Sequence, residues 1–174
     1  MTVQYAVVAF PILDTAADIE PVRRRFDPLA LLLPAHVTLV FPFSDAASEA
    51  EVAKHIACAV ANQRAFDITL ADVSVEDGGY IFLNVTTGAD VLGDLHDRLY
   101  TDLLASHLSS THQYRPHITI GRLPDPEQLG LAAEEARKRL ALPVRGKIND
   151  VALFRLDEMG RGAVIRTIGL VRGF

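Results

Sequence analysis

The 174-residue sequence contains a single cysteine, Cys58, and no excess of basic residues. One thiol can form neither an intramolecular disulfide nor a cysteine-based metal cluster. With 17 Lys and Arg against 22 Asp and Glu, the formal net charge is −5. This charge argues against sequence-blind binding along a long nucleic acid, which needs a basic face, but it is compatible with a local basic pocket for one phosphate.

Long apolar runs are also missing. A membrane-spanning helix needs roughly 20 apolar residues, whereas the longest candidate here, 29–33, is short and is followed by Pro34. The first residues carry neither a basic segment nor a small-residue cleavage site, so no secretion signal is predicted. We therefore expect a cytoplasmic protein that has no membrane partner, and we expect it to be a monomer.

What the chain does have is 49% hydrophobic residues, enough for a substantial core. Alternating apolar stretches bounded by proline and glycine predict strands, and apolar spacing of three to four residues after a capping residue predicts helices. The expected strands are 3–10, 36–41, 66–75, 80–85, 117–123, 144–156 and 163–171, with Pro42 and Pro124 closing the second and fifth. The expected helices are 14–26, a second that Ser44 or Asp45 caps and that runs to about 63, 90–105 and 126–140.

The order of these elements repeats. After the opening strand 3–10, the series helix, strand, helix, hairpin occurs at about 12–87 and again at 88–174. No linker or low-complexity segment separates the two copies. The sequence therefore predicts an α+β fold in one domain, 1–174, with two pseudo-symmetric lobes around a central cleft. Each lobe is expected to be an antiparallel sheet with helices on its outer face.

A His-x-Thr pattern occupies the same position in both copies. His117 follows His36 by 81 residues, and Thr119 follows Thr38 by the same interval. Residues i and i+2 of a strand share a face, so each histidine lies beside its threonine while the apolar residues between them face a core. Two lobes related by a two-fold axis would bring both pairs together across one cleft.

Such a cleft suits phosphodiester chemistry. One imidazole can accept a proton from the attacking oxygen while the other donates a proton to the leaving oxygen. The ordinary pKa of histidine, about 6.5, allows both protonation states near neutral pH. Threonine hydroxyls can donate to the non-bridging phosphate oxygens. A metal is not required for this mechanism, and the sequence predicts none.

One such motif alone is weak, because the polar segment around His107 and Ser109 matches it too. A single strand-end histidine can be bonded to backbone, with threonine chosen for its β-propensity. The shared context of the other two favours function: a preceding proline, an apolar strand, a closing proline and equivalent positions in the repeat.

The two motifs, HVTL at His36 and HITI at His117, resemble those of the two-histidine phosphoesterase superfamily. The flanks LPAHVTLVFPF and YRPHITIGR resemble, within it, the 2′-5′ RNA ligase and cyclic phosphodiesterase family. By element order, the resemblance covers essentially the whole chain. It implies a bilobal fold and cofactor-free, metal-independent chemistry on 2′-5′ or 2′,3′-cyclic RNA phosphates. It also implies that His36 and His117 are catalytic and that Thr38 and Thr119 bind phosphate.

Arg122 matches an arginine often found in that family five residues after the second histidine. Simple alternation would place Arg122 on the other face of the strand, but Gly121 can allow a bulge that turns it back. Its role is then a phosphate clamp, and the alternative is a surface ion pair. The first copy has Phe41 at this position, so the lobes are not expected to contribute equally.

Supporting roles are less specific. Tyr80 and Phe43 are candidates for stacking on a base, with core packing as the alternative, whereas Phe82 fits a plain core position. The basic run 23–25 is either a solvated helix end, which the helix dipole favours, or a contact to an RNA backbone.

The leading hypothesis is an enzyme that hydrolyses 2′,3′-cyclic phosphate RNA ends or small cyclic nucleotides, with reversible 2′-5′ ligation as a further activity. The alternative is a non-catalytic module that binds an RNA end or a nucleotide in the same cleft. An enzyme acting on a cyclic phosphate outside RNA is a third reading. The sequence does not decide which histidine acts as acid and which as base.

Overall fold

The computed structural model describes residues 4–14, 16–44, 47–157 and 161–172. In chain order these residues form β1 (Gln4–Ala9), β2 (Ile12–Leu13), α1 (Ala16–Phe26), β3 (Val37–Phe43), α2 (Glu49–Val60), β4 (Phe66–Glu76), β5 (Tyr80–Val85), α3 (Ala89–Leu99), the 3-10 helix η1 (Asp102–His107), β6 (His117–Arg122), α4 (Pro126–Arg139), β7 (Val144–Ile148), β8 (Asp150–Leu156) and β9 (Gly162–Gly169). None of the helices in these ranges is long and apolar enough to span a membrane.

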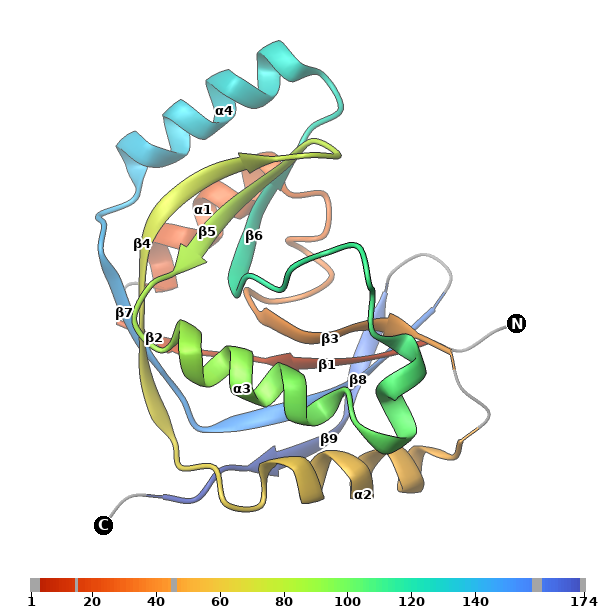
Figure 1. Cartoon of the computed structure of the whole chain (residues 1–174). Coiled ribbons are helices and arrows are strands. Elements are labelled where there is room, and N and C mark those ends of the chain that lie inside the picture. Colours follow the sequence, from red (N-terminus) through yellow and green to blue (C-terminus); the bar gives the residue numbers. More distant parts are fainter. Residues whose placement is uncertain (1–3, 15, 45–46, 158–160, 173–174) are drawn as a thin grey trace.

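The described strands build one curled sheet in the order β2-β7-β4-β5-β6-β3-β1-β8-β9 (Figure 1). All ladders between the named strands are antiparallel. The two halves of the sheet meet where β3 pairs with β6 through Val37 and Ile118. The predicted α+β class is confirmed. The two antiparallel sheets that were expected are the two halves of one continuous sheet.

Each half of the sheet takes strands from both copies of the sequence repeat. The half with β6 holds the hairpin β4–β5, whereas the half with β3 holds β8 and β9. Helix α1 packs on β6 and on α4, and α3 packs on β3 and on α2 (Figure 1). Strand β3 of the first copy therefore lies with β8 and β9 of the second copy, and β6 of the second copy lies with β4 and β5 of the first. The two histidine strands, β3 and β6, are neighbours at the centre of the sheet.

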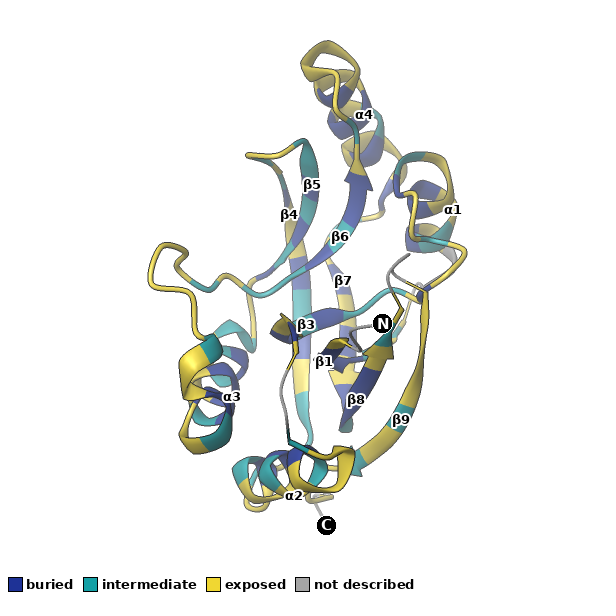
Figure 2. Ribbon diagram, turned by 90° about the vertical axis from the view of Figure 1, so that its right-hand side faces the viewer, coloured by how far each residue is buried: buried dark blue, intermediate teal, exposed yellow. Residues whose placement is uncertain are grey.

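Helix α2 begins with a capping box. The side chain of Ser48 accepts a hydrogen bond from the backbone N–H of Glu51, and the carboxylate of Glu51 accepts from the N–H of Ser48. The predicted caps were Ser44, which lies four residues earlier, and Asp45, which lies outside the described residues. Val52, Ile56 and Val60 of α2 are buried, and Figure 2 shows the buried part of this helix turned toward the strands.

Two predicted strand boundaries are wrong. Pro42 does not close β3, which continues to Phe43. Beyond Val37 the β6 side of β3 has no strand partner, so an absent N–H is tolerated there. The stretch 144–156 is not one strand. It divides at Asn149 into β7, which pairs with β4, and β8, which pairs with β1.

Side chains replace the missing strand partner along β3. Nδ1 of the buried His96 lies 2.8 Å from the carbonyl of Leu39, and the hydroxyl of Tyr114 donates to the carbonyl of Thr38 at 2.9 Å. The rings of His96 and Tyr114 stack with 3.9 Å between centroids. These contacts satisfy backbone groups that would otherwise be unpaired and hold β3 in place beside β6.

Candidate active site

Four polar side chains lie at the β3–β6 junction. Val37 and Ile118 are fully buried and pair across the junction, so the residues on either side of them point to the opposite face. Antiparallel register then sets His36 toward Thr119 and Thr38 toward His117. We call this side of the sheet the His–Thr face. The structure thus brings together both predicted motifs, which lie 81 residues apart in the sequence.

The two histidines are held in the same way. Nδ1 of His36 lies 2.8 Å from the carbonyl oxygen of Pro34, and Nδ1 of His117 lies 2.7 Å from that of Arg115. A carbonyl oxygen can only accept, so each Nδ1 carries the proton and donates it. The neutral rings therefore present Nε2 with a lone pair, which is the atom that can exchange a proton with a ligand.

Burial lowers the pKa of both imidazoles below the ordinary value of 6.5. The hydrogen bonds to the carbonyls of Pro34 and Arg115 oppose this effect, because they stabilise the charged ring. A positive charge on His36 lowers the pKa of His117 further. Without a bound anion the pair therefore resists double protonation, and a phosphate between the rings would reverse that tendency.

Aromatic rings flank both histidines. Phe82 stacks on His117 with 3.5 Å between centroids and an interplanar angle of 14°, and Phe10 meets His36 edge-on at 6.2 Å. The prediction that Phe82 is a plain core residue is wrong. It pairs with Thr119 across β5 and β6 and is only half-buried. The sequence did not identify this role because the pairing of β5 with β6 joins the two copies of the repeat.

Arg122 lies on the His–Thr face because of a bulge in β6. The register shifts between Phe82, opposite Thr119, and Ile81, opposite Gly121, so that Arg122 stands opposite Tyr80. Its guanidinium carbon lies 4.8 Å from the centroid of the Tyr80 ring. In the part of the chain that the structure describes, no carboxylate pairs with Arg122, so the surface ion pair considered above is not formed.

A side chain at position 121 would crowd the bulge. A Cβ on Gly121 would meet Cβ of Phe26 and Cδ1 of Ile81 at 3.0 Å. Phe41, at the equivalent place in β3, is 47% exposed and has its backbone N–H bonded to the Tyr100 hydroxyl. The guanidinium of Arg122 therefore has no counterpart at position 41 of β3.

The two candidate stacking residues differ in position. Tyr80 is half-buried, lies at the start of β5 and tilts against Phe82 with 5.8 Å between centroids. Phe43 is only 4% exposed and packs against Tyr5 and His107. The proposed stacking role of Phe43 is not supported, because its ring belongs to the core. That error follows from ending β3 at Pro42.

Neither reading of the run 23–25 applies to Arg23, which is 1% exposed. Its guanidinium donates to Asp27 Oδ2 at 2.9 and 3.2 Å, to Glu20 Oε1 at 3.0 Å and to the carbonyl of Leu33 at 2.9 Å. Glu20 Oε1 also accepts from the N–H of Ala35 at 3.1 Å. Helix α1 thereby fixes the segment 33–35, and the carbonyl of Pro34 in this segment orients the ring of His36.

A second polar group stands beside His117. Arg115 forms an ion pair with Glu76, and Ser74 donates to the same carboxylate at 2.6 Å. The hydrogen bond from Ser74, followed by those of Arg115, lowers the pKa of Glu76 against the effect of burial. Asn84, which pairs with His117 across the strands, donates to Ser74 Oγ at 2.9 Å. Side chains of β4 and β5 thus hold Arg115, whose backbone carbonyl accepts the hydrogen bond from His117 Nδ1.

Among residues 4–14, 16–44, 47–157 and 161–172, no three His, Cys, Asp or Glu side chains are grouped closely enough to hold a metal ion. The site that the described side chains form consists of two imidazoles, two hydroxyls and one guanidinium, framed by aromatic rings. This set can exchange protons and donate hydrogen bonds to an anion.

Comparison with known proteins assigns the family. The family model of the 2′-5′ RNA ligase superfamily matches residues 11–160, and the chain belongs to this superfamily. A candidate phosphoesterase of Geobacillus kaustophilus (strain HTA426), GK0864, is 32% identical over 128 residues, which are 71% of this chain and 72% of the relative. A second, GWCH70_0799 of Geobacillus sp. (strain WCH70), is 30% identical over the same shares of both chains.

Solved structures share the fold. Escherichia coli LigT complexed with NADP+ superposes with a TM-score of 0.64 at 17% identity and 98% coverage of both chains. LigT complexed with 3′-AMP gives 0.60 at 18% identity, covering 96% of this chain and 99% of LigT. TT0787 of Thermus thermophilus gives 0.63 at 14% identity, covering 96% and 97%. The family supports a phosphodiesterase-type function for this chain.

Proposed function

We propose that this protein is a metal-independent phosphodiesterase that opens 2′,3′-cyclic phosphates at RNA ends or in small cyclic nucleotides. The observation that carries this proposal is the matched pair of imidazoles at the β3–β6 junction. His36 and His117 each donate Nδ1–H to a backbone carbonyl two residues earlier and leave Nε2 for proton exchange. The nucleotide bound to LigT in the structure with 3′-AMP is consistent with a ligand of this kind.

In the hydrolytic direction, Nε2 of one neutral histidine accepts a proton from water as the water oxygen attacks phosphorus. Nε2 of the other, protonated histidine donates its proton to the ribose oxygen as the bond from that oxygen to phosphorus breaks. The product is a phosphate monoester with a free ribose hydroxyl. When the 5′-hydroxyl of a second RNA replaces water and the 2′-oxygen keeps the phosphate, the same proton transfers join a 2′-5′ linkage.

The remaining polar groups would stabilise the phosphoryl oxygens. The hydroxyls of Thr38 and Thr119 donate to non-bridging oxygens, on which negative charge is redistributed in the transition state. Arg122 adds a full positive charge that can bind two oxygens at once. Since a bound phosphate raises the pKa of both imidazoles, substrate itself helps to protonate the histidine that acts as acid.

The test is a turnover measurement on an RNA oligonucleotide that ends in a 2′,3′-cyclic phosphate. We expect the wild type to hydrolyse this end, and His36→Ala and His117→Ala each to lose turnover by about 100-fold or more while they remain folded. His112→Ala is the control, because His112 is exposed and its Nδ1 contacts the hydroxyls of Ser109 and Thr111. Near wild-type turnover in either site variant would refute the acid–base pair.

The alternative function, binding without catalysis, is separated by the same substrate. A binding module would retain the oligonucleotide with a measurable Kd, and wild type would release no product. Binding alone would not require two matched imidazoles that both present Nε2 for proton exchange, so we favour the enzyme.

A further inference from the structure

Asn84 of β5 carries a buried amide oxygen beside the candidate active site. Among the buried side-chain nitrogen and oxygen atoms of the residues that the structure describes, Oδ1 of Asn84 alone has no hydrogen-bond partner. A buried acceptor without a donor is costly to a folded protein, so such an atom calls for an explanation. The proton transfers proposed above make no use of it.

Asn84 lies on the His–Thr face. It is the cross-strand partner of His117 on β6 and of Asp72 on β4. Residues directly opposite each other in antiparallel strands share a face, so these three side chains form one row across the sheet. Phe82, also on β5, stacks on the His117 ring, which therefore leans toward β5. The amide of Asn84 is thus a neighbour of this imidazole.

The contacts of the amide show which end faces which strand. Nδ2 of Asn84 donates to Oγ of Ser74 at 2.9 Å and to Oδ2 of Asp72 at 3.3 Å. The hydroxyl of Ser74 spends its own hydrogen on Glu76, and a carboxylate only accepts, so both contacts on β4 require a donor. Oδ1 is therefore the end directed away from β4, and β6 with His117 lies on that side.

His117 in its neutral form cannot donate to this oxygen. Its N–H group, at Nδ1, donates to the carbonyl of Arg115, and Nε2 carries a lone pair. Two acceptors, Nε2 of His117 and Oδ1 of Asn84, thus stand on neighbouring strands of one face. An O–H group of a ligand can donate to such acceptors.

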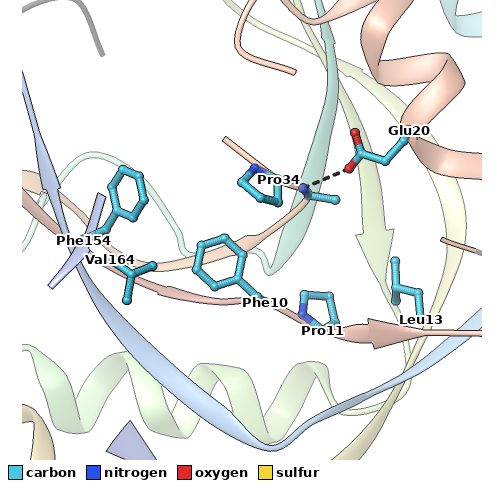
Figure 3. A pocket seen from close by; sticks show the side chains of 8 residues that line it. Phe10, Pro11, Leu13, Glu20, Pro34, Phe154 and Val164 are labelled. Atoms are coloured by element: carbon cyan, nitrogen blue, oxygen red, sulfur yellow. Dashed lines mark hydrogen bonds between the residues drawn. The ribbon is translucent and has the colours of Figure 1, made fainter. Parts of the chain in front are cut away.

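The surroundings of His36 differ. Phe10 meets its ring edge-on with 6.2 Å between centroids. Phe10 and Pro34 line a pocket of about 410 Å³ whose walls are apolar side chains apart from Glu20 (Figure 3). Oε1 of Glu20 already accepts from the N–H of Ala35, the hydrogen bond that Figure 3 marks by a dashed line. The unpartnered amide oxygen lies beside the other imidazole.

We infer that Oδ1 of Asn84 accepts a hydrogen bond from the O–H group of the ligand that reacts at His117. This inference rests on the proposed function and adds a contact to its mechanism. If His117 is the base, the group belongs to water. One hydrogen of the water passes to Nε2 as its oxygen bonds to phosphorus, and the other, which stays on that oxygen in the monoester, is donated to Oδ1. If His117 is the acid, the group is the ribose hydroxyl that forms when Nε2 protonates the leaving oxygen.

Turnover of adenosine 2′,3′-cyclic phosphate tests the contact with water. Asn84→Leu has a side chain of similar size and lacks both polar ends of the amide, and Asn84→Ala repeats the comparison with less bulk. The loss of one hydrogen bond should lower kcat about 3- to 10-fold with KM nearly unchanged. Asp72→Ala is the control, because it removes a contact of Nδ2 and leaves Oδ1 in place. It should keep wild-type kcat, and urea denaturation establishes that each variant is folded.

Ser74→Ala separates this contact from a purely structural role of Asn84. It breaks the link from Asn84 to the carboxylate of Glu76 and leaves Asp72 to orient the amide. Asn84→Leu should lower kcat by the same factor in the wild-type and Ser74→Ala backgrounds. A loss that disappears in the Ser74→Ala background would overturn the inference. A shift of the pH–rate limb of His117 without a fall in maximal kcat would also overturn it, because Oδ1 would then serve the protonated ring alone.

Calorimetric titration tests the contact with ribose. The ligands are 2′-AMP and 3′-AMP, which keep one free hydroxyl next to the phosphate, and their counterparts 3′-deoxy-2′-AMP and 2′-deoxy-3′-AMP. If the ribose is the donor, wild type binds one monophosphate about 3- to 10-fold more tightly than its deoxy counterpart, and Asn84→Leu binds both alike. A loss of kcat without this difference assigns the contact to water. Unchanged kcat together with equal discrimination in both proteins refutes it.

Failure of the proposed function has a different signature, because wild type would then leave the cyclic phosphate intact. The titrations alone judge Asn84 in that case. Discrimination between hydroxyl and deoxy ligands that wild type shows and Asn84→Leu loses supports the contact. Equal discrimination in the two proteins, or none in wild type, overturns it.

Discussion

The buried guanidinium of Arg23 makes the strongest prediction about stability. Arg23→Met keeps the aliphatic chain but removes the cation from a network in which Asp27 is 5% exposed. The carboxylate of Asp27 then stays buried without its partner, and the carbonyl of Leu33 loses a donor at 2.9 Å. Arg25→Met is the matched control from the same helix, where the side chain is 57% exposed and pairs with Glu135.

The magnitude follows from burial. Removing one partner of a buried ion pair costs about 3–5 kcal/mol, and a lost hydrogen bond adds about 1 kcal/mol. We expect Arg23→Met to lower the free energy of unfolding by about 4 kcal/mol. An exposed pair contributes less than about 1 kcal/mol, which is the limit for Arg25→Met. For a chain of this length, about 4 kcal/mol corresponds to a fall in Tm of roughly 8–16 °C.

The assay is urea denaturation of both variants and the wild type, followed by turnover at a temperature at which all three are folded. Arg23→Met should also lower kcat, because segment 33–35 no longer holds the Pro34 carbonyl against His36. Arg23→Lys should recover part of the stability. If Arg23→Met is no less stable than Arg25→Met, the network does not support the fold in the way described.

Three further predictions concern the histidines and the metal. Burial lowers the pKa of His36 and His117 below 6.5. Below pH 6.5 the unfolded chain therefore binds more protons at these two rings than the folded chain does. The stability that the neutral rings contribute is complete above pH 6.5 and is lost as the pH falls toward the folded-state pKa values. In urea titrations, the double variant His36→Gln/His117→Gln should therefore lose less stability than wild type between pH 7.5 and 5. An equal loss in both proteins would contradict this. Phe82→Leu removes the ring stacked on His117 and should lower kcat about 2- to 10-fold and move the pH–rate limb of His117 toward 6.5, whereas Phe66→Leu, which leaves that ring in place, should do neither. Turnover should survive EDTA, and a loss on chelation that added metal restores would exclude the metal-independent mechanism.

The candidate site was predictable where local periodicity determines direction. Alternation in two apolar strands places His36 and Thr38 on one face, and His117 and Thr119 on one face, before any strand pairing is known. Arg122 needed one more step, the bulge that Gly121 allows. The equal intervals of 81 residues then connected the two strands.

Long-range packing decided what the sequence did not predict. Arg23 has its acidic partners three residues before and four residues after it, a pattern that exposed helices also show. Its burial depends on segment 33–35 folding over α1, which no local pattern reveals. Likewise, the stretch 144–156 divides at Asn149, and only the curl of the sheet sends its two parts to opposite halves.

The central claim is that His36 and His117 act as one acid–base unit, and a double-mutant cycle on a 2′,3′-cyclic phosphate substrate tests it most directly. Residues that act as a unit are not additive. We expect each single substitution to Ala to lower kcat about 100-fold or more, and the double variant to be hardly slower than the slower single variant. Losses that multiply in the double variant would contradict a shared step, as would a single variant that retains wild-type turnover.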